Sequence, residues 1–318
     1  EGVDDRPSHS PALSGAEQRP LRMRGSQRTT RSDRRRFTEE TFPYEEVAPL
    51  EFFELHNGVR MPAIGLGVFQ VPPGERTQAT VESALRRGYR LIDTAAYYSN
   101  EADVAIGLER SEVPRSEVFL TSKVWLDDQG YDSTLRAFDR TVKLLKVDVI
   151  DLYLIHWPVD ELHLESWRAL VQLQQEGRCR AIGVSNYTEQ HLDKLARTSS
   201  VIPAVNQVEF HPFVYRPTLV ERCREANIQM QAYSPLVRGK RFNHPKILAL
   251  AEKYQRTSAQ ILLRWNLEHR IPVIPKTTNR ERMTENLDIF GFRLAPEEVA
   301  SLDALSCGFH VCWNPYED

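Results

Sequence analysis

The feature that most constrains the fold of this chain is a regular alternation of short apolar runs with longer amphipathic segments. Short apolar runs are typical of buried strands, and apolar residues spaced three or four apart are typical of helices. Eight runs are predicted to be strands: 63–66, 89–92, 118–121, 149–155, 180–184, 204–208, 228–232 and 271–274. Eight amphipathic segments are predicted to be helices: 75–87, 101–109, 131–145, 162–175, 189–196, 218–225, 246–267 and 279–287.

This alternation predicts an α/β protein with parallel strands. The run Val149–Ile155 is apolar on both faces, as in a parallel sheet that helices cover. Eight strand–helix units over about 260 residues correspond to a (β/α)8 barrel, or TIM barrel. A doubly wound two-domain fold would carry a G-x-G-x-x-G phosphate loop. The nearest match, Gly65-Leu66-Gly67, has no third glycine, so we favour the barrel.

Two segments lie outside the eight units. Apolar residues flank His56-Asn57-Gly58, and an Asn-Gly pair in this setting predicts a β-hairpin, which we expect to plug the N-terminal end of the barrel. Ala295-Pro296 begins an extra helix with proline in its first turn. The polar and aromatic tail that follows, Ser306–Asp318, is a candidate to lie across the mouth of the barrel.

Residues 1–50 differ in composition from residues 51–318, which we expect to form the barrel domain. Pro, Ser, Gly and charged residues dominate, so this segment has too little apolar surface to offset the entropy of ordering, and we predict a disordered extension. It contains a cluster of arginines at positions 22, 24, 28, 31, 34, 35 and 36. Acidic residues precede the cluster, which argues against a transit peptide. Binding of the cluster to an anionic partner stays open.

The overall charge and hydropathy favour small-molecule chemistry. Lys and Arg number 41 against 44 Asp and Glu, so there is no general positive field to bind nucleic acid or an anionic membrane. No run approaches the roughly 20 apolar residues of a membrane-spanning helix, and no signal peptide is recognisable. The four cysteines match no zinc or redox spacing, and we expect no metal. We therefore expect a cytoplasmic, monomeric protein.

Polar residues stand where the predicted strands end. They are Asp93, Lys123, His156, Ser185, Asn186, Gln207, Glu209, Tyr233, Ser234 and Lys276. In a parallel barrel these ends converge on one mouth, where active sites lie. A helix cap or a solvated charge explains each residue alone. However, a lysine that ends an apolar strand needs a partner, and Asp93 is the nearest candidate for Lys123. An Asp–Lys pair beside a tyrosine suits proton transfer.

Seven short motifs contain these residues. They are Ile92–Glu101, Thr121–Trp125, Asp151–Pro158, Gly183–Asn186, Asn206–Glu209, Tyr233–Leu236 and Ile274–Lys276. In this order they resemble the aldo-keto reductase superfamily, from about Gly58 to Leu305. Gln129–Leu135 and Leu236–Lys240 are similar to its microbial branch, which includes 2,5-diketogluconate reductases and protozoan prostaglandin F synthases.

The resemblance implies NADPH-dependent reduction of an aldehyde or ketone. Tyr98, at the family spacing after Asp93, would be the general acid, although Tyr97 is adjacent. A phenol has an ordinary pKa of about 10, and a nearby cation such as Lys123 is expected to lower it. Asp93 would keep Lys123 charged, and His156 would orient the carbonyl oxygen. A regulatory or structural protein of the same fold is the alternative, but all four catalytic residues are present.

The resemblance also assigns the NADP(H) contacts. Ser185, Asn186, Gln207 and Tyr233 would hold the nicotinamide, and Ser234, Leu236 and Arg238 the pyrophosphate. The adenosine end falls to Lys276, Thr277, Arg282, Glu285 and Asn286. Lys276 and Arg282 flank a predicted helix start, whose free N–H groups favour a 2′-phosphate. Phe69, Tyr98, Trp125, His156 and Trp157 would form the substrate pocket. The physiological substrate stays open, and Glu209 and His211 are expected to be structural.

Overall fold

Seven parallel strands form the centre of the fold. A computed structural model describes residues 50–316; the predicted disordered extension before Leu50 and the last two residues lie outside the described residues. The strands pair in chain order: β3 (Leu66–Gly67), β4 (Leu91–Asp93), β5 (Phe119–Val124), β6 (Ile150–Ile155), β7 (Cys179–Ser185), β8 (Val205–Glu209) and β9 (Gln229–Tyr233).

The eighth predicted strand closes the ring without forming a regular strand. Val273 makes parallel bridges to both Ile64 and Ala232, so it connects the two edges of the sheet. The Ala232 N–H also donates to the carbonyl oxygen of Pro272 at 2.8 Å. Pro272 and Pro275 have no N–H to give to a ladder, which limits the pairing to single bridges. The predicted (β/α)8 barrel is therefore confirmed, with a much reduced eighth strand.

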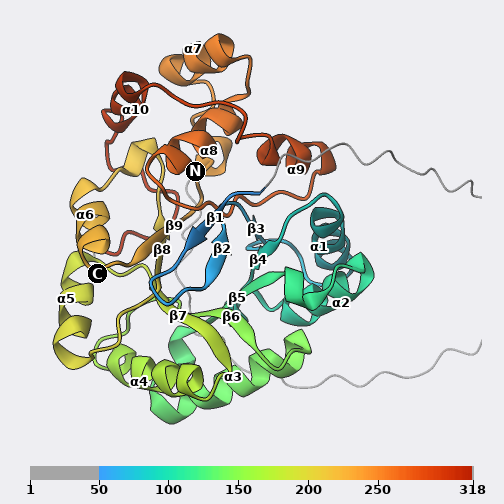
Figure 1. The fold of residues 1–318 in the computed structure, drawn as a ribbon, viewed down its shortest axis with the longest axis vertical. Helices are drawn as coiled ribbons and strands as arrows, with labels where there is room; N and C mark the ends of the chain where they lie inside the picture. Colours follow the sequence, from blue (N-terminus) through green and yellow to red (C-terminus); the bar gives the residue numbers. More distant parts are fainter. Residues whose placement is uncertain (1–49, 317–318) are drawn as a thin grey trace, which may run out of the picture. The chain divides into compact units, whose positions relative to one another are not determined.

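Helices surround this ring (Figure 1). They are α1 (Glu75–Arg86), α2 (Glu101–Ser111), α3 (Tyr131–Leu145), α4 (Leu162–Gln175), α5 (Glu189–Thr198), α6 (Pro217–Glu225), α7 (Pro245–Tyr254), α8 (Ser258–Glu268), α9 (Arg280–Leu287) and α10 (Pro296–Asp303). Within residues 50–316, no helix has the length and apolar character needed to cross a bilayer.

The prediction of one continuous helix over 246–267 is wrong. Gln255 adopts a left-handed conformation with φ 51° and ends α7. Thr257 then begins α8, because its side chain accepts a hydrogen bond from the Gln260 N–H while the Gln260 side chain bonds back to the Thr257 N–H. This capping box satisfies N–H groups that a new helix leaves free. The apolar residues on both sides of the break between α7 and α8 have helical spacing, so the sequence pattern did not reveal the break.

Side chains alternate between the two sides of the strands. On β6, Leu152 and Leu154 point into the barrel, whereas Tyr153 and Ile155 join the core between strands and helices. This alternation follows from the two-residue period of a strand. It places every second residue near a strand end in the barrel interior, where a site can form.

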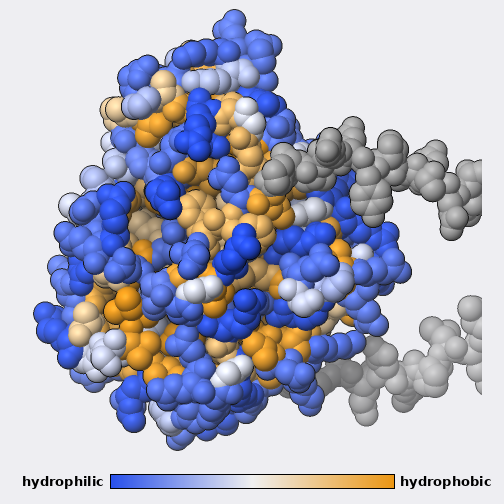
Figure 2. All heavy atoms as spheres, viewed as in Figure 1, coloured by the Kyte–Doolittle hydropathy of each residue, from blue (hydrophilic) through white to orange (hydrophobic). Residues whose placement is uncertain are grey.

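The predicted hairpin plug is confirmed. β1 (Phe52–Glu54) and β2 (Arg60–Pro62) pair antiparallel, and Figure 1 shows them across the centre of the ring. Leu55 and Met61 are buried in one cluster with residues from inside the barrel. Figure 2 shows hydrophobic residues at the centre of this face, with hydrophilic residues over most of the surrounding helices. The hairpin thus seals the N-terminal end, and a site has to lie at the other end.

Candidate active site

The centre of the candidate site is a buried lysine between two strands and a tyrosine. Lys123 lies in β5 and is 0% exposed. Its Nζ donates to Asp93 Oδ1 at 2.6 Å and to the Thr94 carbonyl oxygen at 2.9 Å, and it lies 3.4 Å from the Tyr98 hydroxyl. A buried ammonium is costly unless it is paired. Asp93, the last residue of β4, provides that partner.

The loop after β4 fixes the position of Tyr98. This residue ends a short 3-10 helix, η1 (Ala96–Tyr98), and Ser99 follows in the left-handed region with φ 54°. Asn100 then fastens the loop: its Nδ2 donates to the Val68 carbonyl oxygen at 3.1 Å, and its Oδ1 accepts from Thr94 Oγ1 at 2.8 Å. Because both ends of the turn are bound, the Tyr98 ring stays beside Lys123.

The pKa of Tyr98 differs from the value that the sequence predicted. Burial, and then the carboxylate of Asp93, raise the pKa of Tyr98 well above its ordinary value. Burial also lowers the pKa of Lys123, although Asp93 opposes that shift. The expectation of a lowered pKa for Tyr98 is therefore wrong here. Burial disfavours the charged phenolate, and Asp93 balances the ammonium charge at 2.6 Å while the phenol lies at 3.4 Å. The phenol keeps its proton at neutral pH.

His156 and aromatic rings line the same mouth. His156 follows β6, and its ring centroid lies 5.0 Å from that of Trp125 and 5.6 Å from that of Tyr98. Phe69 packs against Tyr98 at 5.0 Å. Burial, followed by the charge of Lys123, lowers the pKa of His156 well below its ordinary value. The imidazole is therefore neutral and has one N–H to donate.

Four polar side chains from β7 to β9 form a network connected to Asp93. Gln207 Nε2 donates to Asp93 Oδ2 at 2.8 Å, and the Ser185 hydroxyl donates to the Gln207 carbonyl oxygen at 2.7 Å. Asn186 Nδ2 donates to Ser185 Oγ at 3.1 Å, and the Tyr233 hydroxyl donates to Asn186 Oδ1 at 2.8 Å. The structure thus brings together the residues expected for the nicotinamide and the proton-transfer group.

The start of α9 offers a site for an anion. Asn279 caps the helix by accepting a hydrogen bond from the Arg282 N–H at 2.8 Å, and Thr277 Oγ1 accepts from the Asn279 N–H at 3.2 Å. Lys276 and Arg282 are exposed and form no ion pair with another residue in the described part of the chain. Two free cations beside a helix N-terminus favour a phosphate group.

Two more residues expected at the adenosine end lie on the same helix. Asn286 is buried, and its side-chain amide lies beside the hydroxyl of the buried Tyr89. Glu285 Oε1 accepts from Thr257 Oγ1 at 2.7 Å, which connects α9 to the beginning of α8.

Comparison with known proteins identifies the family. The model described as the aldo/keto reductase family matches residues 63–306. The chain belongs to this family. It is 46% identical to glyoxal reductase of Bacillus subtilis over 264 residues, 83% of this chain and 96% of that protein. It is 45% identical to 9,11-endoperoxide prostaglandin H2 reductase of Trypanosoma cruzi over 256 residues, 79% and 90% of the two chains.

A solved structure agrees with this assignment. The aldo-keto reductase of Bombyx mori, in complex with NADP, superposes with a TM-score of 0.79 at 33% identity, covering 83% of this chain and 95% of that one. The resemblance read from the motifs is confirmed, and this aldo/keto reductase is an oxidoreductase.

The residues expected at the pyrophosphate lie on a strained turn of this aldo/keto reductase. Ser234, Leu236 and Arg238 are on or beside η5 (Val237–Gly239), and φ is 52° at Val237, 49° at Arg238 and 76° at Gly239. A left-handed conformation costs a residue with a Cβ about 1–2 kcal/mol, and a β-branched residue is especially unsuited to it. Val237 therefore adopts a backbone conformation that is unfavourable for its residue type.

Replacement of Val237 tests that strain. Val237→Gly and Val237→Ala both remove the buried side chain, but only glycine adopts a positive φ without a steric penalty. We expect the glycine variant to be more stable than the alanine variant by about 1 kcal/mol. Urea unfolding of the two variants measures the difference. An alanine variant as stable as the glycine variant would show that the turn is not strained.

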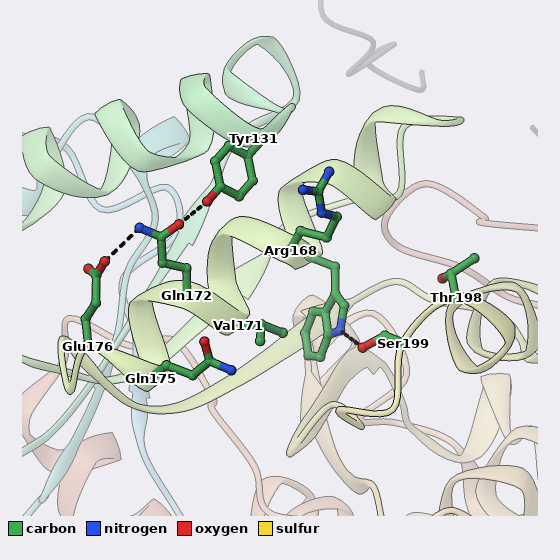
Figure 3. A pocket seen from close by; sticks show the side chains of 9 residues that line it. Tyr131, Arg168, Val171, Gln172, Gln175, Glu176, Thr198 and Ser199 are labelled. Atoms are coloured by element: carbon green, nitrogen blue, oxygen red, sulfur yellow. Dashed lines mark hydrogen bonds between the residues drawn. The ribbon is translucent and has the colours of Figure 1, made fainter.

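A separate open pocket lies outside the barrel, along α4 (Figure 3). Its volume is about 610 Å³, and it is lined by Tyr131, Trp167, Arg168, Val171, Gln172, Gln175, Glu176, Thr198 and Ser199. Several of its polar side chains bond one another: Trp167 Nε1 donates to Ser199 Oγ at 3.2 Å, and Gln172 bonds both Tyr131 and Glu176. None of the candidate site residues lines it, and we assign it no function.

Sequence reasoning missed three features of the site. Gln231 accepts from Gln207 at 2.8 Å, and the signal for it was a polar residue inside an apolar run. Tyr97 stacks on Trp125 with ring centroids 3.9 Å apart. A further contact joins Trp157, expected in the pocket, to Trp313 at 5.3 Å, and Trp313 belongs to the tail that was a candidate to lie across the mouth. The Thr94 carbonyl group that binds Lys123 had no signal, because it belongs to the backbone.

Proposed function

We propose that this enzyme reduces aldehydes and ketones to alcohols, with hydride from NADPH and a proton from Tyr98. The observation that carries the proposal is the buried Lys123, whose ammonium contacts both the Asp93 carboxylate and the Tyr98 hydroxyl. This arrangement holds a protonated phenol at the mouth of the barrel. Protein side chains supply protons but no hydride, so the reaction requires the cofactor.

NADP(H) is the cofactor that the site fits. The exposed cations Lys276 and Arg282 at the start of α9 suit an adenosine 2′-phosphate. The related Bombyx mori enzyme is in complex with NADP. When bound, the cofactor supplies the hydride. The residues that we propose to hold it are Ser185, Asn186, Gln207, Tyr233, Ser234, Leu236, Arg238, Lys276, Thr277, Arg282, Glu285 and Asn286.

Each catalytic residue has a distinct role in this proposal. The Tyr98 hydroxyl gives its proton to the carbonyl oxygen. As the proton leaves, negative charge develops beside the Lys123 ammonium, and the attraction in a buried site stabilises it. This interaction grows during the reaction and so offsets the raised pKa of the resting phenol. Asp93 keeps Lys123 in place, and the neutral His156 donates a hydrogen bond that orients the carbonyl oxygen.

Phe69, Trp125 and Trp157, together with Tyr98 and His156, are proposed to line the substrate pocket. The rings of Phe69, Tyr98, Trp125 and His156 contact one another around the mouth, whereas Trp157 contacts Trp313 of the C-terminal tail. NADPH oxidation in the presence of aldehydes, ketones, keto-sugars and quinones tests the proposal. We expect turnover with aldehydes and ketones, and absence of turnover with every carbonyl compound would contradict it.

The rate of reduction is expected to change little between about pH 7 and 9. The raised pKa of Tyr98 keeps the acid form present throughout this range, and the lowered pKa of His156 keeps the imidazole neutral. At higher pH the rate should fall as Lys123, whose pKa burial lowers, loses the charge that stabilises the phenolate. Tyr98 itself, with its raised pKa, should lose its proton only above the ordinary range of a phenol. A profile of kcat/KM for one aldehyde measures this. A decline that begins below pH 8 would contradict this expectation, because it would mean that Tyr98 or Lys123 loses its proton near neutral pH.

We also propose that the enzyme is a monomer of a reducing compartment such as the cytoplasm. All four cysteines are free, as is usual where disulfides do not persist. Within residues 50–316, the large apolar side chains that are exposed lie singly on different elements: Phe52, Tyr97, Leu144, Leu162, Leu248 and Tyr316. Scattered residues of this kind do not require a partner surface. Light scattering measures the molar mass in solution and so tests whether the enzyme is a monomer.

A further inference from the structure

The interior of the barrel contains a pair of glutamines that joins two neighbouring strands. Gln231 lies in β9 and is 0% exposed, and its register partner on β8 is Gln207. Register partners point to the same side of a sheet, and here the two side chains meet: Gln207 Nε2 donates to Gln231 Oε1 at 2.8 Å. Apolar side chains such as Leu152 and Leu154 share this interior. Two buried amides in such surroundings need hydrogen-bond partners.

Both hydrogen atoms of the Gln207 side-chain nitrogen are used. This nitrogen donates to Asp93 Oδ2 at 2.8 Å as well as to Gln231 Oε1, and an amide nitrogen carries two hydrogens. A reversed amide would place the Gln207 oxygen against the Asp93 carboxylate and the Gln231 oxygen, and two acceptors cannot bond one another. The two partners therefore fix which end of the Gln207 amide faces them.

The side-chain oxygen of Gln207 is left to accept from another group. Within residues 50–316, the hydrogen bonds of this side chain all run through Nε2. The backbone carbonyl oxygen of Gln207 accepts from the Ser185 hydroxyl at 2.7 Å and from the Asn186 N–H at 2.9 Å, so Gln207 belongs to the network proposed for the nicotinamide. A carboxamide has an NH2 group, whose hydrogens require an acceptor of this kind.

The hairpin plug contacts the other end of the Gln231 amide. Gln231 Nε2 lies 3.7 Å from the sulfur of Met61, which is in β2, and a thioether sulfur is a weak acceptor. The NH2 group of Gln231 thus faces the plug, and its oxygen faces Gln207. An apolar side chain of similar size would fill this space but would accept no hydrogen bond. Packing alone therefore does not explain a glutamine at this position.

We propose that Gln231 is a positioning residue for the cofactor: it accepts the second N–H of Gln207 and so holds Gln207 Oε1 in one direction, as the acceptor for the carboxamide NH2 of the nicotinamide. The inference rests on the proposed reductase function and its cofactor. Gln231 is fully buried and acts through Gln207 alone. Without this acceptor, one buried N–H of Gln207 is unsatisfied, so the amide turns to another partner and its oxygen loses its direction.

The test compares the cofactor affinity of Gln231→Met with that of the unchanged enzyme. Methionine has a similar length but no oxygen to accept the Gln207 N–H. Each protein is titrated with NADP+ and with its 3-acetylpyridine analogue, in which a methyl group replaces the NH2 of the carboxamide, and tryptophan fluorescence reports Kd. We expect Kd for NADP+ to rise about tenfold in Gln231→Met, as for one lost hydrogen bond. Kd for the analogue should stay within about twofold, because the analogue has no N–H to donate.

Two further variants separate positioning from general damage. Gln207→Met removes the proposed acceptor itself and should weaken NADP+ binding by a similar factor. The double variant should show no additional loss, because both residues act on one hydrogen bond. Asn266→Leu is the matched control, since it also replaces a buried amide with an apolar side chain of similar size, but Asn266 lies on α8 and its Nδ2 donates to the Leu262 carbonyl oxygen of the same helix. It should leave both affinities unchanged.

The preference of the unchanged enzyme for NADP+ over the analogue should therefore disappear in Gln231→Met. Equal weakening of both cofactors in this variant, or no weakening of either, would overturn the positioning role, as would an unchanged enzyme that binds both equally well. If the unchanged enzyme reduces no carbonyl compound, the proposed function fails, whereas the binding results decide the role of Gln231 separately. Should Gln231→Met not fold, Gln231→Leu removes the same acceptor and takes its place.

Discussion

Replacement of Tyr98 by phenylalanine is expected to lower the rate of carbonyl reduction by about 10²- to 10⁴-fold, the range that general acid catalysis contributes. Phenylalanine keeps the ring that packs against Phe69 and His156, so the mouth keeps its shape. Only the hydroxyl next to Lys123 is lost. NADPH binding should be largely unchanged, since the proposed cofactor residues lie elsewhere.

Lys123→Met should cause a loss of similar size. The raised pKa of Tyr98 makes the resting phenol a weak acid, so its proton transfer depends on stabilisation by the ammonium. Because Tyr98 and Lys123 act on the same proton, the double variant should be little worse than either single variant. Asp93 is left without its buried partner in Lys123→Met, so the folded fraction needs to be measured as well.

Tyr97→Phe is the matched control, because it removes a hydroxyl from the neighbouring tyrosine. The Tyr97 side chain is 42% exposed and stacks on Trp125, on the outer side of the mouth. We expect a change of less than about threefold, which is small beside the 10²-fold effects of general acid catalysis. Single-turnover oxidation of NADPH with one reactive aldehyde compares all four variants. A large loss in Tyr97→Phe, or a small one in Tyr98→Phe, would mean that the donor is misassigned.

The position of the site followed from the sequence for a physical reason. Parallel strands bring their C-terminal ends to one mouth, so Asp93, Lys123 and His156 had to meet once the strands were recognised. The pairing of Lys123 with Asp93 also followed, since a buried ammonium requires a carboxylate. The ends of the strands were predicted less accurately than their existence. Lys123 lies within β5, whereas the pattern predicted it just beyond the strand.

Other features depend on interactions that local patterns do not contain. Glu209 and Val311 are 102 positions apart, and neither side chain nor spacing indicates that they bond. The raised pKa of Tyr98 depends on burial and on the distances of Asp93 and Lys123, which only three-dimensional coordinates supply. The expectation of a lowered pKa considered the cation without the carboxylate that balances it.

Arg282→Ala is expected to weaken NADPH binding while leaving NADH binding nearly unchanged. The two cofactors differ only in the 2′-phosphate, and Arg282 is an exposed cation in the first turn of α9. A charge-assisted hydrogen bond contributes about 1 to 3 kcal/mol, which corresponds to roughly 5- to 150-fold in affinity. Titration of intrinsic tryptophan fluorescence with each cofactor measures Kd at one fixed ionic strength.

Arg280→Ala separates a direct contact with the phosphate from the general positive charge at the start of the helix. Arg280 is also exposed and begins the same helix. If the two arginines act only through a diffuse positive field, both variants should lose the same affinity and added salt should remove the difference. If Arg282 binds the phosphate directly, its loss exceeds that of Arg280 at every salt concentration. Equal affinity of the unchanged enzyme for NADPH and NADH would contradict the assignment of the 2′-phosphate to this helix, whatever the variants show.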